Sequence, residues 1–259
     1  MLVQGKKVIV TGGLTGIGKE TLFDMAKEGA SVVSFSRKKA DSKEAMEIIS
    51  KAKELGNGLF KHIQCDVTNQ EEVKKAVDEA VEFLDGLDAV VNSAAIEFTG
   101  LPEEVTPEAL YTPIYVSLGG TAFVSAAAFP YLKDNGGVVV NFTSVAGIDG
   151  KEDMPGYTSA KGAVMSYTRM LASAWGKYNI RSNVINPSVK TELVEEWLEN
   201  MTPEEREQTI AWIDNSIPLK GGLRGPKEVA YLITFLVSDR ASYITGQTIN
   251  IDGGITYSR

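Results

Sequence analysis

Tyr157 and Lys161 have the residue types and the spacing needed to move a proton. Four positions separate them, so a helix here would place the phenol and the ammonium one turn apart on the same face. A free phenol, with a pKa of about 10, is a poor base at neutral pH, and a close cation lowers that pKa by about 1–3 units. The pair predicts a site where Tyr157 gives a proton to a carbonyl oxygen or takes one from an alcohol.

Ser144 stands thirteen residues before Tyr157, just after the apolar run 138–142. A hydroxyl at the carboxyl end of a parallel strand faces the crevice where ligands bind, and there it would polarise a carbonyl beside Tyr157. Serine after a strand is also a common turn or cap residue. Its role therefore depends on the residues around it.

A glycine-rich turn, residues 11–18, lies between the first apolar run and the first helical segment. Glycine is needed where the backbone turns sharply and approaches a pyrophosphate, and the helix that follows directs its N–H groups at the phosphates. We expect the cofactor-binding residues in this turn to be Gly12, Leu14, Thr15, Gly16 and Ile17.

The end of the second apolar run indicates which dinucleotide is bound. An acidic side chain there would accept hydrogen bonds from the ribose 2′-hydroxyl of NAD(H) and repel a 2′-phosphate. The sequence instead places Ser36, Arg37 and Lys38 at this point. A hydroxyl and a guanidinium fork suit a phosphate, so we favour NADP(H) over NAD(H), although the same residues also fit an ordinary basic surface loop.

Runs rich in β-branched residues alternate with segments of helical period. Strands are expected at 8–10, 31–35, 60–64, 89–91, 138–142, 184–185 and 248–251, and helices at 17–28, 42–55, 70–84, 107–132 and 156–178. This alternation predicts the α/β class, with a doubly wound parallel sheet of the Rossmann type. We find no repeat or linker and expect one domain over 1–259.

The segment 191–218 interrupts the alternation with a helical stripe that includes Trp197, Leu198 and Met201, followed by a second short helix. The stripe either packs on the core or forms a small helical lid over an apolar substrate, and such a pair of helices can do both.

Composition excludes several classes. A net charge of −8 argues against nucleic acid or an anionic membrane as the partner. No apolar run approaches the ~20 residues that span a bilayer, so we expect a cytoplasmic protein. Cys65 and His62 are the only cysteine and histidine, which excludes an internal disulfide and leaves no evident metal site. Cys65 is expected to be a buried, inert thiol.

Together these motifs resemble the short-chain dehydrogenase/reductase family over nearly the whole chain. Its glycine motif is matched by Thr11, Gly12, Gly16 and Gly18, and its catalytic set by Ser144, Tyr157 and Lys161 in the family's order and spacing. Asp66 followed by Val67 matches the adenine-contacting pair. Residues 244–247 and 252–254 match the family's tail.

The resemblance implies further roles. Lys161, with Tyr157, would also contact the nicotinamide ribose, Asn92 and Ala94 would support the cofactor in the middle of the sheet, and Pro187, Val189 and Thr191 would line the nicotinamide. It also implies a homotetramer formed through the helices at 107–132 and 156–178.

Three positions depart from the family pattern. The usual Asn-Asn-Ala-Gly reads Asn92-Ser93-Ala94-Ala95, and the usual Pro-Gly reads Pro187-Ser188, so a small shift of the cofactor is expected. The family's catalytic asparagine aligns with Ser117, whose hydroxyl or carbonyl would hold a water in a rearranged proton relay.

The expected function is NADP(H)-dependent interconversion of a secondary alcohol and a ketone. The loss of the asparagine and the stretch Tyr131-Leu132-Lys133 resemble some bacterial hydroxysteroid dehydrogenases, and a steroid or bile-acid alcohol suits the lid. The alternatives are reduction of 3-oxoacyl thioesters, an isomerase or dehydratase on the same fold, and a non-catalytic NADP(H)-binding sensor.

Overall fold

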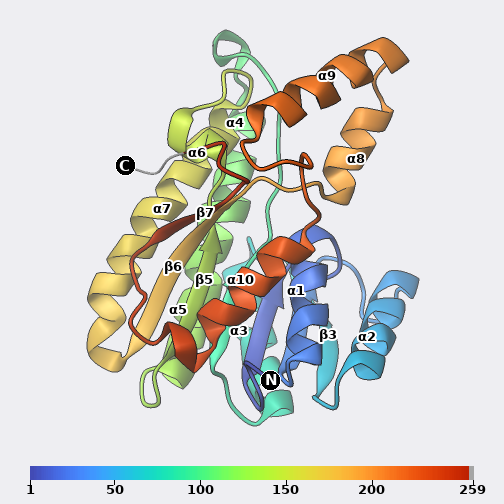
Figure 1. Ribbon diagram of the computed structural model, residues 1–259. Coiled ribbons are helices and arrows are strands. Elements are labelled where there is room, and N and C mark those ends of the chain that lie inside the picture. Colours follow the sequence, from blue (N-terminus) through green and yellow to red (C-terminus); the bar gives the residue numbers. More distant parts are fainter. Residues whose placement is uncertain (257–259) are drawn as a thin grey trace.

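The computed structural model describes residues 1–256, apart from the side chain of Leu193; positions 257–259 of the expected domain lie outside the described residues. A parallel sheet of order β3-β2-β1-β4-β5-β6-β7 forms its centre (Figure 1). The strands are β1 (Lys7–Thr11), β2 (Ser31–Ser36), β3 (Phe60–Gln64), β4 (Ala89–Asn92), β5 (Gly137–Phe142), β6 (Ile180–Pro187) and β7 (Thr248–Ile251). From β1 the strands are added outward as β2 and β3, and the chain then crosses back to place β4 to β7 on the other side of β1. This reversal of the strand order confirms the predicted doubly wound fold.

Helices cover both faces of the sheet. They are α1 (Gly16–Lys27), α2 (Lys43–Leu55), α3 (Gln70–Leu84), α4 (Pro107–Pro113), α5 (Gly120–Leu132), α6 (Val145–Asp149), α7 (Pro155–Trp175), α8 (Glu192–Glu199), α9 (Pro203–Ser216) and α10 (Lys227–Val237). A π-helical turn, η2 (Ile114–Gly119), joins α4 to α5. β6 is longer than the expected 184–185, because its polar positions Ser182 and Asn183 are buried in the ladder rather than exposed.

Two apolar cores lie on opposite sides of the sheet. One joins the sheet to α1, α2 and α10, with Leu22, Met25 and Ile233 fully buried. The other joins it to α3, α5 and α7, with Val77, Val124 and Leu171 at its centre. Because the strands are buried on both faces, they read as continuous apolar runs. The two cores fix the carboxyl ends of the strands relative to the N-terminal ends of α1 and α7.

The helical stretch Pro107–Leu132 has the length and composition of a membrane span, with a mean hydropathy of 1.3 in its most apolar window. The sequence predicts no such segment, because no uninterrupted apolar run approaches the ~20 residues that span a bilayer. In the fold, Val124, Ala128 and Leu132 are completely buried against the second core. The stretch is a core helix, which explains its hydropathy.

The two helices expected in 191–218 are present as α8 and α9, and they project beyond the carboxyl ends of the strands (Figure 1). Leu198 is buried, whereas the side chains of Trp197 and Trp212 are 51% and 69% exposed. A capping box at Thr202 and Glu205 starts α9. The stripe therefore packs on the fold only in part, and its aromatic residues face outward.

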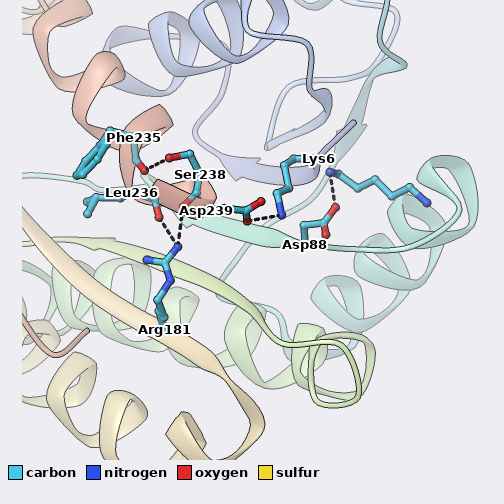
Figure 2. A network of polar contacts seen from close by, with 8 residues as sticks. Lys6, Asp88, Arg181, Phe235, Leu236, Ser238 and Asp239 are labelled. Carbon is cyan, nitrogen blue, oxygen red and sulfur yellow. Dashed lines mark hydrogen bonds and ion pairs between the residues drawn. The ribbon is translucent and has the colours of Figure 1, made fainter. Parts of the chain in front are cut away.

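The opposite end of the sheet carries a structural polar network (Figure 2). Arg181 donates hydrogen bonds to the carbonyl oxygens of Leu236 and Ser238, which end α10, and Lys6 pairs with Asp239 at 3.0 Å. Asp88 accepts a hydrogen bond from the backbone of Lys7. These groups line a cleft, but they satisfy one another and the end of a helix. The reacting residues lie at the other end of the strands.

Candidate active site

Tyr157 and Lys161 lie in the first two turns of α7, as their spacing predicts. Both side chains are buried, with exposed fractions of 9% and 3%. The Lys161 Nζ atom lies 5.4 Å from the centre of the Tyr157 ring and donates a hydrogen bond of 3.2 Å to the carbonyl oxygen of Phe142, the last residue of β5. The ammonium is thereby held beside the phenol at the carboxyl edge of the sheet.

The pKa of Tyr157 differs from the expectation. The sequence predicts that Lys161 lowers it, but burial raises it above its ordinary value, and the charge of Glu97 raises it further, while hydrogen bonding to Ser144 opposes the change. Burial also lowers the pKa of Lys161 to about 8, against the opposing effect of Glu97. The reason is desolvation, which disfavours both charged forms and here outweighs the attraction between the two groups.

Glu97 is a site residue that the sequence pattern does not indicate. It follows β4 on a segment fixed at both ends: the Ala94 N–H donates to Thr11 Oγ1 at 3.0 Å, and the Gly100 N–H donates to the carbonyl oxygen of Asp153 at 2.8 Å. The segment thus runs from the glycine-rich turn to the loop before Tyr157. The charge of Glu97 raises the pKa of the Tyr157 phenol.

Ser144 lies just after β5 and caps a helix. It is the N-cap of the short helix α6, where its Oγ accepts a hydrogen bond of 3.2 Å from the Ala146 N–H. Ser144 also opposes the rise in the pKa of Tyr157. A hydroxyl whose acceptor site is used by the cap keeps its proton for a second partner.

Ser117 lies in the π-helical turn η2, and its side chain is only 2% exposed. Within the described residues its Oγ atom has no hydrogen-bond partner. Single π-turns inside helices are frequent at functional sites, and a buried polar atom without a partner is a natural place for an ordered water. The position of Ser117 is compatible with the water relay expected for it, and that role stays a prediction.

The glycine-rich turn fits a dinucleotide. Gly12 and Gly16 have φ values of +66° and +50°, which favour glycine. A Cβ on Gly12 would lie 3.2 Å from the backbone of Ser93 and Ala94, so this turn is in close contact with the chain after β4. Leu14 is buried, whereas Thr15 and Ile17 remain partly or wholly exposed at the start of α1. The turn thus leads into the N-terminal end of α1, the kind of helix end that binds phosphate.

That helix end is bonded to a carboxylate. Glu192, the first residue of α8, accepts a hydrogen bond of 3.0 Å from the Gly16 N–H and pairs with Lys19 one turn along α1. Burial opposes the charge of Glu192, but the Lys19 ammonium and the backbone N–H groups hold its pKa below the ordinary value. The carboxylate uses the N–H group that a pyrophosphate would need.

Asn92 is buried in the centre of the sheet. Its Nδ2 donates to Ser125 Oγ at 3.2 Å and to Asn141 Oδ1 at 2.9 Å, and Asn141 in turn donates to Thr168 on α7. The Oδ1 atom of Asn92 has no partner among the described residues. The side chain links β4, β5 and two helices while one acceptor stays available. Its support of a cofactor stays a prediction.

The predicted 2′-phosphate residues lie together after β2. Arg37 and Lys38 are exposed, and Ser36 is half-buried. Lys38 pairs with Glu44, whereas no ion pair to Arg37 occurs in the part of the chain that the structure describes. The guanidinium is thus available to an incoming anion.

The remaining predicted cofactor residues also lie on the carboxyl side of the sheet. Asp66 holds a turn by accepting hydrogen bonds from the Thr68 N–H and Oγ1, and Val67 is buried against Gly120. Val189 is buried after β6, while Pro187 and Thr191 are half-buried and flank it. Adenine and nicotinamide contacts by these five residues stay predictions.

Among residues 1–256, no group of three histidine, cysteine, aspartate or glutamate side chains is placed to hold a metal ion. Cys65 is buried as expected, and burial raises the pKa of its thiol to about 12. A thiol with that pKa is inert at neutral pH.

A buried tyrosine–lysine pair and a glycine-rich βα turn, both at the carboxyl edge of a doubly wound sheet, are typical of a dinucleotide-dependent oxidoreductase. A family model described as enoyl-(acyl carrier protein) reductase matches residues 12–256. The chain is 34% identical over 257 residues to a 3-oxoacyl-[acyl-carrier-protein] reductase of Thermotoga maritima, covering 98% of this chain and 99% of that one. It is 32% identical to a meso-2,3-butanediol dehydrogenase of Serratia marcescens, covering 100% and 97%.

A solved short-chain type dehydrogenase/reductase from Mycobacterium ulcerans has the same fold, with a TM-score of 0.89 at 29% identity, covering 98% of this chain and 91% of that one. The chain belongs to the short-chain dehydrogenase/reductase family.

Proposed function

We propose that the protein is an NADP(H)-dependent enzyme that interconverts a secondary alcohol and a ketone, with Tyr157 as the acid/base. The observation that carries the proposal is the placement of Tyr157 and Lys161. Both are buried and close together at the carboxyl edge of the sheet, on which the glycine-rich turn also lies. A non-catalytic sensor would have no need to bury a lysine beside a tyrosine, which costs stability.

Each side chain of the site has its own role in the proton transfer. Tyr157 gives its proton to the carbonyl oxygen during reduction, and the Ser144 hydroxyl polarises the same oxygen. Lys161 stabilises the phenolate that remains, and its pKa of about 8 allows it to pass on a proton near neutral pH. When bound, the nicotinamide ring supplies the redox chemistry by giving or accepting a hydride.

Reprotonation of Lys161 needs a path from solvent. We assign that path to a water held by the free Oγ atom of Ser117, because α7 and η2 pack on one another and this hydroxyl has no described partner. Ser117→Ala would lower kcat without changing the affinity for NADPH. Ser117→Asn, whose side chain can also hold a water, would keep kcat near that of the parent. Equal turnover of Ser117→Ala and the parent would remove Ser117 from the relay.

Two features of the site bear on the substrate. The exposed apolar side chains of α8 and α9, Trp197 and Trp212, support a bulky substrate such as a hydroxysteroid or bile acid. The Glu97 carboxylate beside Tyr157 supports a substrate that carries a second hydroxyl near the reacting carbon. The name of the Serratia marcescens relative, a diol dehydrogenase, agrees with the second feature. The name of the Thermotoga maritima relative favours a 3-oxoacyl thioester as a second candidate.

The test is a coupled assay of NADPH consumption and product formation, with ketosteroids, hydroxyketones and 3-oxoacyl thioesters as substrates, each compared with NADH. Stoichiometric consumption of NADPH with one ketone class supports the proposal and names the class. Tight NADPH binding without turnover of any class would contradict it in favour of the sensor, and redox-neutral conversion of a substrate would favour an isomerase or dehydratase.

We propose that the protein acts as a homotetramer in the cytoplasm. Phe123 and Ala127 on α5 are half-buried and available to an interface, whereas Val164 on α7 is 1% exposed and already belongs to the protomer core. Light scattering of the purified protein tests the state directly: a mass of four chains supports it, and a monomer contradicts it.

A further inference from the structure

His62, the only histidine of the chain, lies on β3 beneath the loop that follows β2. Its side chain is 4% exposed. Its Nδ1 atom lies 2.9 Å from Ser34 Oγ, and its Nε2 atom lies 3.0 Å from the Lys38 carbonyl oxygen and 3.3 Å from Ser36 Oγ. The imidazole ring thus contacts Ser34 on β2, the backbone of Lys38 in the loop after β2, and the Ser36 hydroxyl between them.

The partners determine the tautomer of the ring. A carbonyl oxygen only accepts, so the bond to Lys38 requires the proton on Nε2. Nδ1 is then the acceptor for the Ser34 hydroxyl. Burial lowers the pKa of His62 below its ordinary value, which keeps the ring in this neutral form at physiological pH.

This arrangement sets the direction of the Ser36 hydroxyl. Its Oγ atom receives the Lys38 N–H at 3.2 Å and faces the Nε2–H of His62. Both groups are donors, and the Nε2–H, whose shorter bond is to the Lys38 carbonyl oxygen, is shared with this oxygen. Neither group can accept the Ser36 proton, and no acceptor for that proton occurs among the described residues. A hydroxyl held in this way donates outward, as a bound anion requires.

A second side chain of β3 acts on the same loop. Gln64 donates a hydrogen bond of 3.0 Å from Nε2 to the Arg37 carbonyl oxygen, and the Cys65 N–H donates to the Ser36 carbonyl oxygen at 2.8 Å. The backbone of residues 36–38 is therefore fixed from below. The Arg37 guanidinium remains exposed above it.

We propose that His62 is a positioning residue for the 2′-phosphate of NADP(H), which holds the Ser36 hydroxyl as a donor and fixes the backbone of Arg37 and Lys38. This inference rests on the proposed function and deepens it, because it assigns cofactor selection to a residue that does not touch the cofactor. A loop that is already ordered does not lose conformational entropy when the 2′-phosphate binds to it. His62 should therefore affect the affinity for the 2′-phosphate and not the affinity for the adenosine.

Calorimetric titration with 2′,5′-ADP and 5′-AMP separates the two parts of the ligand. His62→Leu is expected to weaken the binding of 2′,5′-ADP about tenfold, which corresponds to the loss of one hydrogen bond. The affinity for 5′-AMP is expected to stay unchanged. His62→Gln, whose amide can donate to the Lys38 carbonyl, is expected to recover most of the affinity for 2′,5′-ADP. Gln64→Leu, at an exposed position, is a second variant that leaves the core intact and is expected to weaken 2′,5′-ADP alone.

The outcomes are distinct. Wild-type protein that prefers 2′,5′-ADP, together with a His62→Leu variant that keeps the full preference, would overturn this inference and leave the NADP(H) assignment standing. An equal loss for both nucleotides in both His62→Leu and Gln64→Leu would also overturn it, because the residues would then support only the fold. Wild-type protein that binds the two nucleotides equally would overturn the assignment and the inference together.

The single histidine also allows a direct spectroscopic check. Nitrogen-15 spectra of the labelled protein should show one neutral imidazole with its proton on Nε2, and its signals should shift on addition of 2′,5′-ADP but not of 5′-AMP. A proton on Nδ1, or a signal that does not respond to the 2′-phosphate, would contradict the arrangement.

Discussion

The carboxylate of Glu192 accepts a hydrogen bond of 3.0 Å from the backbone N–H of Gly16, although 176 positions separate them in the chain. The contact joins the first residue of α8 to the N-terminal end of α1. Since a helix N-terminus binds anions, Glu192 and a pyrophosphate compete for the same donor. We therefore predict that cofactor binding displaces Glu192 and couples α8 to the cofactor site.

Glu192→Gln removes the competing charge. We expect the Kd for NADPH to fall about three- to tenfold, the equivalent of one net hydrogen bond. Fluorescence titration of the purified protein measures it. Glu196→Gln, an exposed position on the same helix, is the matched control and should leave the Kd unchanged. Weaker binding by Glu192→Gln would show that the carboxylate assists the cofactor instead of competing with it.

Glu97→Gln tests the carboxylate beside the phenol. Because the charge of Glu97 raises the pKa of Tyr157, removal of this charge should lower that pKa. The acidic limb of the pH profile for alcohol oxidation should then move to lower pH by about 0.5–1 unit. The pH dependence of kcat/KM measures the limb. The exposed Glu152, replaced by Gln, is the control. A limb that stays in place or rises would show that Glu97 does not act on the proton transfer.

Lys161→Met tests the cost of burying the ammonium. Burial lowers the folded-state pKa of Lys161 from 10.5 to about 8, so the unfolded state holds more protons between these values and the free energy of unfolding rises with pH there. Below that window the wild type carries the full penalty, and the Met variant should be more stable at pH 7 by roughly 1–3 kcal/mol.

Urea denaturation at pH 7 to 9.5 measures both effects, and the gain of Lys161→Met should shrink as the pH rises. Lys133→Met, at an exposed position, should change neither the stability nor its slope. A Lys161→Met variant that is less stable than the wild type at pH 7 would contradict the burial argument.

Arg37→Ala tests the choice of cofactor. Loss of a charge-assisted bond to the 2′-phosphate should raise the KM for NADPH about 10- to 100-fold and leave that for NADH nearly unchanged. Steady-state kinetics with both cofactors give the comparison, with the neighbouring Lys39→Ala as control. Equal changes for NADPH and NADH would mean that Arg37 does not contact the 2′-phosphate.

Much of the fold follows from the sequence because the sheet is buried on both faces. The strands then read as apolar runs, and the turn at Gly12 and Gly16 marks the first crossover. The α7 pair was predictable too, since a spacing of four residues is a local property. The boundaries of β6 were not, because buried polar side chains such as Asn183 interrupt its apolar pattern.

The residues that the sequence did not indicate act through contacts with distant parts of the chain. Glu97 and Glu192 are acidic residues in a loop and at a helix start, and nothing in their local sequence separates them from the rest of an acidic surface. The direction of the pKa of Tyr157 depends on desolvation, which spacing does not reveal. His62 shows its role only when β2 and β3 are paired in register, with Ser34 opposite His62.

The most direct test of the account is the Tyr157→Phe variant, which removes only the reacting hydroxyl. NADPH binding should be unchanged, and turnover of the best ketone should fall about 10²- to 10⁴-fold, the usual contribution of a positioned acid/base. Binding by fluorescence and single-turnover rates on the same preparation give both numbers. Unchanged binding with that loss supports Tyr157 as the acid/base, whereas a variant that retains most of the turnover would contradict the mechanism proposed for this site.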